Sequence, residues 1–507
     1  MNLTRLILLL IGLLPACVTT PAPAPPFTPT PPEQLIQPLN FEYKGAFKVP
    51  IESTPSSWAW GMNDSTVQSL TYYPGGDKSG PNDAYPGSLF GGGHVYQKAI
   101  SEISIPVPVI SKDHKPAALN RATTLQPFAD ITGGLMTKIP VDGQGSVTVH
   151  YLPGTPEKLM WVGYQAYNVS GCDVTPYTFG WSDLTLSSPN AAGLWKMKTG
   201  TPGSTAKSMM TVPEWFTESD PAIKGMTLGV WRSRPGGLCT SFGPSLYLTN
   251  PRSAGPNPPN KTEFKDVYAL GYSSTEEAYQ YAPSHGSQSY PGYQAGDNWG
   301  GGAFLEAGNR RALVFVGTKA LGIKAAIPDI TDPHQQTYYG LQRQVYAVTE
   351  KTGDVSGTAT GEKSGQQSAV VWVTATHVVL SPSGEGGKLN YANQEMVTTT
   401  GGGRFRINTP AVYVDAGTAH GYYSGPYQPQ AILYDPAAIR AFIHHNSRRV
   451  VPYAVIDLTD MWQPCGPCLI GGTAWDPAHG LLYILQSSIY WEGSDPYPII
   501  HVYKINP

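Results

Sequence analysis

A pattern of short strands that recurs along the chain limits the fold more than any other feature of this sequence. In its clearest form, small residues at 471–475 make a strand, Asp476-Pro477 makes a turn, and apolar strands follow at 481–486 and 499–505. Small side chains suit a strand that other strands crowd, and an Asp-Pro step favours a tight turn. The pattern predicts a small antiparallel sheet built from consecutive strands.

Four earlier units repeat this order of strand, turn and strand, and most end in a further extended segment. The predicted strands are 69–73, 88–92, 100–105 and 123–128 in unit one; 147–152, 159–164, 193–197 and 209–216 in unit two; 226–231, 245–248 and 267–271 in unit three; and 300–305, 312–317, 430–434 and 453–462 in unit four. Repeated sheets of about four antiparallel strands predict the blades of a β-propeller. A β-sandwich, or two packed β domains, is the alternative.

The ends of the chain supply complementary parts of one sheet. The fifth unit has three strands, and an extra strand stands alone at 41–49. Pairing the two would close the ring and remove both open edges. We therefore expect an all-β fold, a β-propeller of five blades whose N-terminal strand closes the last blade. Six or seven blades are alternatives, because unit three is weak. The order resembles that of secreted β-propeller proteins in general, a resemblance of fold that names no activity.

The composition agrees with strands and turns. The chain has 56 Gly, 48 Pro and 30 Tyr residues, and only 14% of its residues are charged. Gly and Pro favour turns, and Tyr favours strands. Only 435–446 suggests a short helix. Alternating runs at 345–348, 369–380 and 411–414 predict a β-rich insertion in the fourth unit, at about 335–416.

The N-terminus indicates export. Arg5 precedes an apolar run at 6–14 that is too short to span a bilayer, which requires about 20 residues. The LPAC sequence that ends at Cys17 resembles the bacterial lipobox, which implies a cleaved signal and a lipid on this cysteine; an ordinary signal peptide is the alternative. Residues 18–40 are rich in Pro and Thr and predict a semi-rigid tether. We expect the body, 41–507, to be anchored by its lipid in the bacterial cell envelope, at the outer membrane or cell surface.

The other four cysteines are predicted to form disulfides, as is usual in an oxidising compartment. They are Cys172, Cys239, Cys465 and Cys468. The Cys465-Gly466-Pro467-Cys468 segment has the letters of a redox motif, but it falls in a turn between strands and not at a helix start. Redox chemistry and metal binding are the alternatives.

Several partner classes are not expected. The formal net charge is −3 and no basic run is present, which argues against nucleic acid. The only expected contact with a membrane is through the N-terminal lipid. The sequence contains no P-loop or dinucleotide fingerprint and no pair of histidines at His-x-His or His-x-x-x-His spacing, so neither a cofactor nor a metal is predicted.

In a propeller, the connections between second and third strands emerge on the same face as the connections between blades. The longest predicted insertions, at 165–192, 249–265, 319–429 and 487–498, are all expected on this loop-rich face, where function should concentrate. Its aromatic residues are predicted to bind a ligand or, alternatively, to pack the loops. The candidates are Trp58, Trp60, Tyr164, Trp181, Trp299, Tyr423 and Trp491, with Tyr177 nearby.

Four titratable residues on the same face are candidates for catalysis. Asp64 and Asp297 precede inner strands of different units, and a pair of such acids serves as acid and nucleophile or base in glycoside hydrolysis. His94 and His420 flank loops on this face and could act as bases. Turn formation by the acids, and hydrogen bonding within loops by the histidines, are the alternatives.

These features support three functions. The first is a surface-anchored binding module for a glycan, a polymer or a partner protein. The second is a polysaccharide-active hydrolase or lyase that uses the acids and histidines above. The third is a structural lipoprotein of the envelope. The sequence leaves open whether the protein is an enzyme.

Overall fold

A computed structural model gives the fold. It describes residues 28–51, 60, 69–77, 85–94, 98–139, 145–165, 177–198, 208–232, 243–272, 297–320, 427–445, 450–458, 460–462, 470–492 and 495–507, together with eight short strands between 324 and 406.

The chain forms a five-bladed β-propeller, as the repeat predicts. Each blade is an antiparallel sheet of four strands, except that blade two gains a fifth short strand, β13 (Glu263–Phe264), in parallel pairing. The blades, from inner to outer strand, are β2 (Leu70–Tyr73), β3 (Ser88–Gly92), β4 (Ile100–Ser104) and β5 (Thr124–Ala129); β6 (Gly145–Leu152), β7 (Lys158–Gln165), β8 (Phe179–Ser182) and β9 (Ala192–Met197); β10 (Ser208–Thr211), β11 (Leu228–Arg232), β12 (Ser245–Thr249) and β14 (Asp266–Leu270); β15 (Asn298–Ala307), β16 (Arg310–Ala320), β25 (Tyr427–Tyr434) and β26 (Ala454–Asp457); and β27 (Ile470–Asp476), β28 (Leu481–Glu492), β29 (Asp495–Ile505) and β1 (Phe41–Lys48).

The five inner strands form a closed ring. Each contacts its neighbour, in the order β27, β2, β6, β10, β15 and back to β27. Five separate clusters of buried apolar side chains fill the spaces between successive blades, so every sheet is covered on both faces. This burial between sheets is the main stabilising term of the fold.

Close approach at the axis requires glycine at specific positions of the inner strands. A Cβ atom on Gly472 would lie 2.4 Å from the backbone nitrogen of Leu70 in the next blade. A Cβ atom on Gly301 would lie 2.2 Å from the Thr473 side chain. The small residues that mark the first strand of the C-terminal unit are therefore explained by crowding at the ring.

The N-terminal strand closes the ring, as predicted. β1 pairs antiparallel with β29, from Phe41 opposite Ile505 to Lys48 opposite Ile499, and makes the outer strand of blade five. Asn506 N also donates to the Asn40 carbonyl at 2.8 Å. The first and last segments of the chain thus share one sheet.

The predicted strands of units two and three are wrong in part. The segment 193–197 is the fourth strand of blade two, because β8 lies within the stretch that was expected to be one loop. The segment 209–216 is not an outer strand; β10 is the inner strand of blade three and is followed by the short helix α1 (Glu214–Thr217). β10 has the sequence SMMT, without glycine or an Asp-Pro turn, so it does not match the pattern of the other inner strands.

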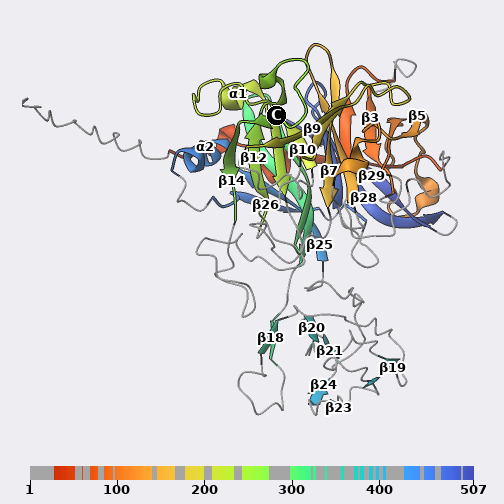
Figure 1. The fold of residues 1–507 in the computed structure, drawn as a ribbon. Coiled ribbons are helices and arrows are strands. Elements are labelled where there is room, and N and C mark those ends of the chain that lie inside the picture. The colour runs from red at the N-terminus through yellow and green to blue at the C-terminus, as the bar shows by residue number, and fades with distance from the viewer. Residues whose placement is uncertain are drawn as a thin grey trace, which may run out of the picture.

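The remaining elements decorate the ring. The predicted short helix is confirmed as α2 (Pro436–His445), whose apolar side packs on blades three and four (Figure 1). The insertion between β16 and β25 is β-rich, as predicted. Its strands are β17 (Lys324–Ala326), β18 (Thr337–Tyr339), β19 (Val355–Thr358), β20 (Val370–Thr374), β21 (His377–Ser381), β22 (Lys388–Tyr391), β23 (Met396–Thr398) and β24 (Arg404–Arg406). None of the helices in the described ranges has the length and hydropathy to span a bilayer.

Closure of the ring predicts a specific sensitivity to mutation. The Phe47 side chain is fully buried between blades five and one. Phe47→Ala should therefore lower the free energy of unfolding by roughly 3–5 kcal/mol. Glu42→Gln, at an exposed position of the same strand, should leave the unfolding midpoint nearly unchanged. Urea unfolding followed by tryptophan fluorescence measures both; equal losses in the two variants would contradict the closure role.

Candidate functional site

A cavity of about 310 Å³ lies at the axis, where the five inner strands end. Every blade contributes to it, because each inner strand runs in the same direction and carries its last residues to the same mouth. Its wall is formed by Thr71, Tyr72, Pro74, His150, Tyr151, Pro153, Met209, Met210, Thr211, Pro213, Trp215, Gly302, Ala303, Phe304, Glu306, Thr473, Ala474, Trp475, Asp476, Pro477 and Ala478.

The cavity lies on the face opposite the one that the sequence favoured. It is bordered by the connections from first to second strands, whereas the insertion 321–426 leaves and rejoins the ring between second and third strands. In Figure 1, α1, which carries the cavity residue Trp215, lies at the top of the ring, and β25 lies towards the bottom. The expectation that all long loops share one face is also wrong for 249–265, because this segment joins the third and fourth strands of blade three.

Two half-buried indoles provide apolar surface in the cavity. Trp475 is near the end of β27, and Trp215 is in α1. The Trp215 ring meets the Phe304 ring edge-on, with 5.9 Å between centroids, and the Arg311 guanidinium lies 5.1 Å from the Trp215 centroid. Packing on both sides fixes the Trp215 ring, so the apolar wall is preorganised.

A buried histidine joins three blades at the cavity wall. His150 Nδ1 lies 3.3 Å from the Thr71 hydroxyl of blade one, and His150 Nε2 lies 3.0 Å from the Thr211 hydroxyl of blade three. The Thr71 hydroxyl also accepts a hydrogen bond from Tyr151 N at 2.9 Å. Burial lowers the pKa of His150 from 6.5 to about 3, so its imidazole is uncharged at neutral pH.

The two carboxylates of the cavity are already engaged. Glu306 Oε1 pairs with Arg311 Nη2 at 2.6 Å. Asp476 is fully buried and accepts from Ala478 N at 3.0 Å and from His479 N at 3.2 Å, and its Oδ2 lies 2.7 Å from His479 Nδ1. Asp476 thus organises the turn after β27, as an Asp-Pro turn requires.

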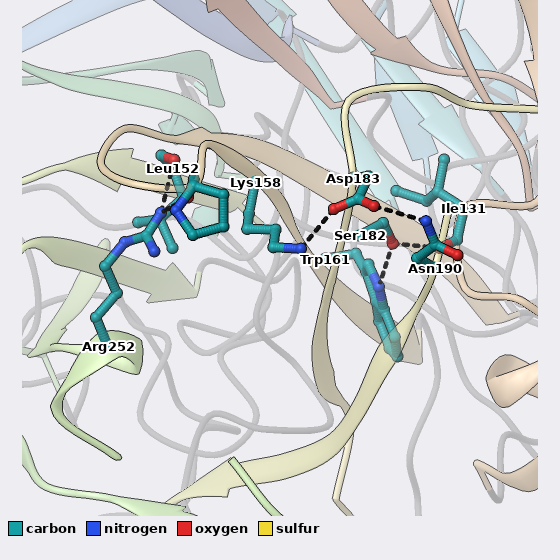
Figure 2. Close-up of polar contacts among 9 residues, drawn as sticks. Ile131, Leu152, Lys158, Trp161, Ser182, Asp183, Asn190 and Arg252 are labelled. Carbon is teal, nitrogen blue, oxygen red and sulfur yellow. Dashed lines mark hydrogen bonds and ion pairs between the residues drawn. The ribbon is translucent and has the colours of Figure 1, made fainter. Parts of the chain in front are cut away.

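Arg252, in the connection that follows β12 of blade three, holds the part of the cavity rim that blade two forms. Arg252 Nη2 donates to the carbonyls of Leu152 at 3.3 Å and Pro156 at 2.7 Å, and its guanidinium lies 5.9 Å from the Trp181 centroid. The turn between β6 and β7 has Gly154 at φ +127°, where a Cβ atom would lie 3.0 Å from Arg252 Nε. Figure 2 shows Arg252 reaching this turn. The contact holds the segment that carries Tyr151 and the neighbouring proline to the cavity.

Further polar contacts hold the rest of blade two. Lys158 Nζ pairs with Asp183 Oδ1 at 2.5 Å, and Asn190 Nδ2 donates to Asp183 Oδ2 at 2.8 Å (Figure 2). Trp161 Nε1 donates to the Ser182 hydroxyl at 3.0 Å, and this hydroxyl donates to the Ile131 carbonyl of the preceding connection (Figure 2). These contacts join neighbouring strands and loops of blade two to one another and to the connection that precedes the blade.

Neither of the predicted catalytic residues that the structure describes, Asp297 and His94, lines the cavity. Asp297 is buried and ion-paired with Lys319, whose Nζ lies 2.8 and 3.1 Å from its two carboxylate oxygens. His94 is also buried. Both lie on the loop-rich side of the ring, while Asp64 and His420 fall outside the described residues. A catalytic role for these four stays a prediction.

The predicted ligand-binding aromatics that the structure describes are packed in the ring. Trp60 packs 5.0 Å from Phe128, Trp181 lies edge-on to Trp195 at 4.7 Å, and Trp299 is fully buried. These contacts favour the packing interpretation. Tyr164 and Trp491 lie in β7 and β28, but their side chains are outside the described residues, as are Trp58 and Tyr423 altogether. The same holds for the cysteines: Cys17, Cys172, Cys239, Cys465 and Cys468.

Sequence reasoning missed the residues that line the cavity. One signal was present: Asp476-Pro477 and the prolines that follow three other inner strands, Pro74, Pro153 and Pro213, mark a shared rim, although each is also explained by a turn. His150 was not considered, because its partners Thr71 and Thr211 are about 60 to 80 residues away. Within the described part of the chain, no group of His, Cys, Asp and Glu side chains has the arrangement of a metal site.

Comparisons with known proteins add little. No family model matches the chain, and none of the curated proteins matches it. Among solved structures, one chain from the structure of a ctPRC2 complex aligns with 92% of this chain and 98% of its own length. The sequence identity is 9% and the TM-score is 0.26. A likeness this weak carries no argument about function.

Burial of neutral histidines predicts how stability depends on pH. The pKa of His501, buried in blade five, is also lowered from 6.5 to about 3 by desolvation. Between pH 6.5 and pH 3, His150 and His501 take up a proton in the unfolded chain but not in the folded chain. The free energy of unfolding should therefore fall as the pH drops from 6.5 towards 3, by about 2 kcal/mol per histidine at pH 5.

Variants isolate this effect. His150→Gln and His501→Gln should each flatten the decline in unfolding free energy between pH 7 and pH 4.5, and the double variant should flatten it additively. Urea unfolding at a series of pH values measures the slopes. Slopes parallel to that of the unmodified protein would show that these histidines are not responsible.

Proposed function

We propose that the protein is a binding module that receives a small group of its ligand in the axial cavity. The ligand is a glycan, a polymer or a partner protein, and the group that enters is uncharged and partly apolar. One observation carries the proposal: the axial cavity combines the surface of two half-buried indoles with a few polar groups held in fixed positions. This composition is typical of small-ligand sites.

The arrangement supports binding better than catalysis. General acid-base chemistry needs a titratable group free to exchange a proton near the working pH. At the cavity, His150 is neutral with its pKa near 3, Glu306 is ion-paired, and Asp476 is committed to its turn. The hydrolase or lyase alternative depends on the two acids, Asp64 and Asp297, and the two histidines, His94 and His420, and we do not favour it.

We further propose that the binding module is anchored through its N-terminus with the cavity face on the side of the anchor. The segment that precedes β1 crosses this face of blade four. Thr30 N and Oγ1 bond to the Asp435 carboxylate at 2.9 and 2.6 Å, and Leu35 forms a β-bridge with Arg311. A chain that continues from Thr30 to a lipid on Cys17 would leave the propeller beside the cavity.

Substitution of the indole wall tests the proposal. Trp475→Ala should lower the affinity for the ligand by roughly 5- to 50-fold, because stacking on an aromatic face contributes about 1–2 kcal/mol or more to binding. A glycan array and a peptide array, probed with the full chain, identify the ligand, and isothermal titration calorimetry measures the affinity. Circular dichroism and thermal unfolding confirm that the variant is folded.

Tyr177→Ala is the matched control on the other face. Tyr177 is half-buried at the start of β8, where its hydroxyl bonds to Glu263 Oε1 at 3.2 Å and Lys196 lies 5.0 Å from its ring centroid. This variant should bind like the unmodified protein. Loss of binding in Tyr177→Ala but not in Trp475→Ala would place the site on the loop-rich face and overturn the proposal.

A further inference from the structure

The hydrogen-bond chain through His150 has a direction. Tyr151 N donates to the Thr71 hydroxyl oxygen at 2.9 Å, so the Thr71 proton is available for His150 Nδ1, 3.3 Å away. With Nδ1 as acceptor, the single proton of the neutral imidazole lies on Nε2 and is donated to the Thr211 oxygen at 3.0 Å. In this arrangement the protons of the buried Thr71 and His150 side chains each have an acceptor, and only the proton of the exposed Thr211 hydroxyl has none among the described residues. The reverse arrangement leaves the Thr71 proton without one.

The last hydroxyl of this hydrogen-bond chain, that of Thr211, indicates what the ligand must offer. Thr211 is exposed, lines the cavity, and accepts from His150, so its own proton is left to be donated into the cavity. The carboxylate of Glu306, whose Oε1 is paired with Arg311, offers its second oxygen as an acceptor. The residues that line the cavity therefore include a donor, Thr211, and an acceptor, Glu306, together with the indole of Trp475.

Charge argues for a neutral ligand group. An anionic group would meet the carboxylates of Glu306 and Asp476 with no unpaired cation among the described lining residues. A cationic group would meet the guanidinium of Arg311, which already pairs with Glu306 Oε1 and covers the Trp215 ring at 5.1 Å. Like-charge repulsion of this kind disfavours both classes.

We infer that the cavity holds one residue of a neutral glycan, with Thr211 as the specificity-determining donor to a sugar oxygen. A neutral sugar ring carries hydroxyl groups that both donate and accept, and it has an apolar face that stacks on an indole. The inference rests on the proposed binding function and narrows its ligand class. In this inference, Thr211 selects ligands that carry an oxygen acceptor at the contacted position. His150 and Thr71 are positioning residues that orient the Thr211 hydroxyl.

The test uses the full chain in a detergent without sugar groups. The probes are neutral oligosaccharides (cello-, malto-, laminari-, manno- and N-acetylated chito-oligosaccharides), an acidic oligogalacturonate, a cationic chitosan oligomer and proline-rich peptides. Neutral oligosaccharides should bind selectively. Thr211→Val should lower that affinity by about 5- to 10-fold, as expected for one lost hydrogen bond, while Thr211→Ser should retain it.

Deoxy analogues of the best sugar separate a donor role from a purely structural one. Removal of the contacted oxygen should weaken binding to the unmodified protein by about 5- to 10-fold and should have little effect on Thr211→Val. Equal binding by the unmodified protein and a folded Thr211→Val would overturn the inference. Binding of only charged oligosaccharides or peptides, with loss in Trp475→Ala, would overturn the sugar assignment and leave the binding module intact. Absence of any binder would overturn both.

Discussion

Pairing of the two chain ends is the interaction on which the rest of this structure depends. β1 and β29 join segments more than 450 residues apart in one sheet. Without this pairing, blade five would keep an open edge and the ring would lack its closure. Closure gives every blade two neighbours, so each of the five apolar clusters is covered on both sides. It also forces the inner strands together at the axis, where Gly472 and Gly301 are needed for close approach.

The cavity follows from the same closure. Five inner strands that run in one direction around an axis deliver their final residues to one mouth, so a site made from all blades needs no dedicated loop. Hydroxyl groups then connect neighbouring blades: Ser69 accepts from Val149 N at 3.2 Å, and Thr473 both accepts from and donates to the Gly302 backbone. These contacts, together with His150, satisfy polar groups that crowding at the axis has removed from water.

Much of the fold was predictable because each blade is a local unit. Units one and five have a first strand, a turn and apolar strands close in sequence, and unit four has its first two strands adjacent; the structure confirms these units together with the closing strand. Units two and three failed where the signal was short. β8 and β10 have four residues each, too few for a period-two pattern to show, and β10 leads into a helix where other inner strands lead into a tight turn. One missed strand shifted the assignment of every following strand until the next clear unit, and with it the face assigned to the 249–265 loop.

The sequence alone determined the local properties of this protein: turn positions, apolar strand runs, the need for small residues near an axis, and the expectation of a tethered, exported chain. Only the tertiary structure decided where the candidate site lies, because residues from all five blades form it. Thr71, His150 and Thr211 belong to three separate sheets, and nothing in their neighbouring residues indicates that they meet. Aromatic residues alone do not distinguish a binding wall from a packed core. Trp299 and Trp475 both sit in inner strands, yet closure of the ring buries the first and leaves the second at the cavity.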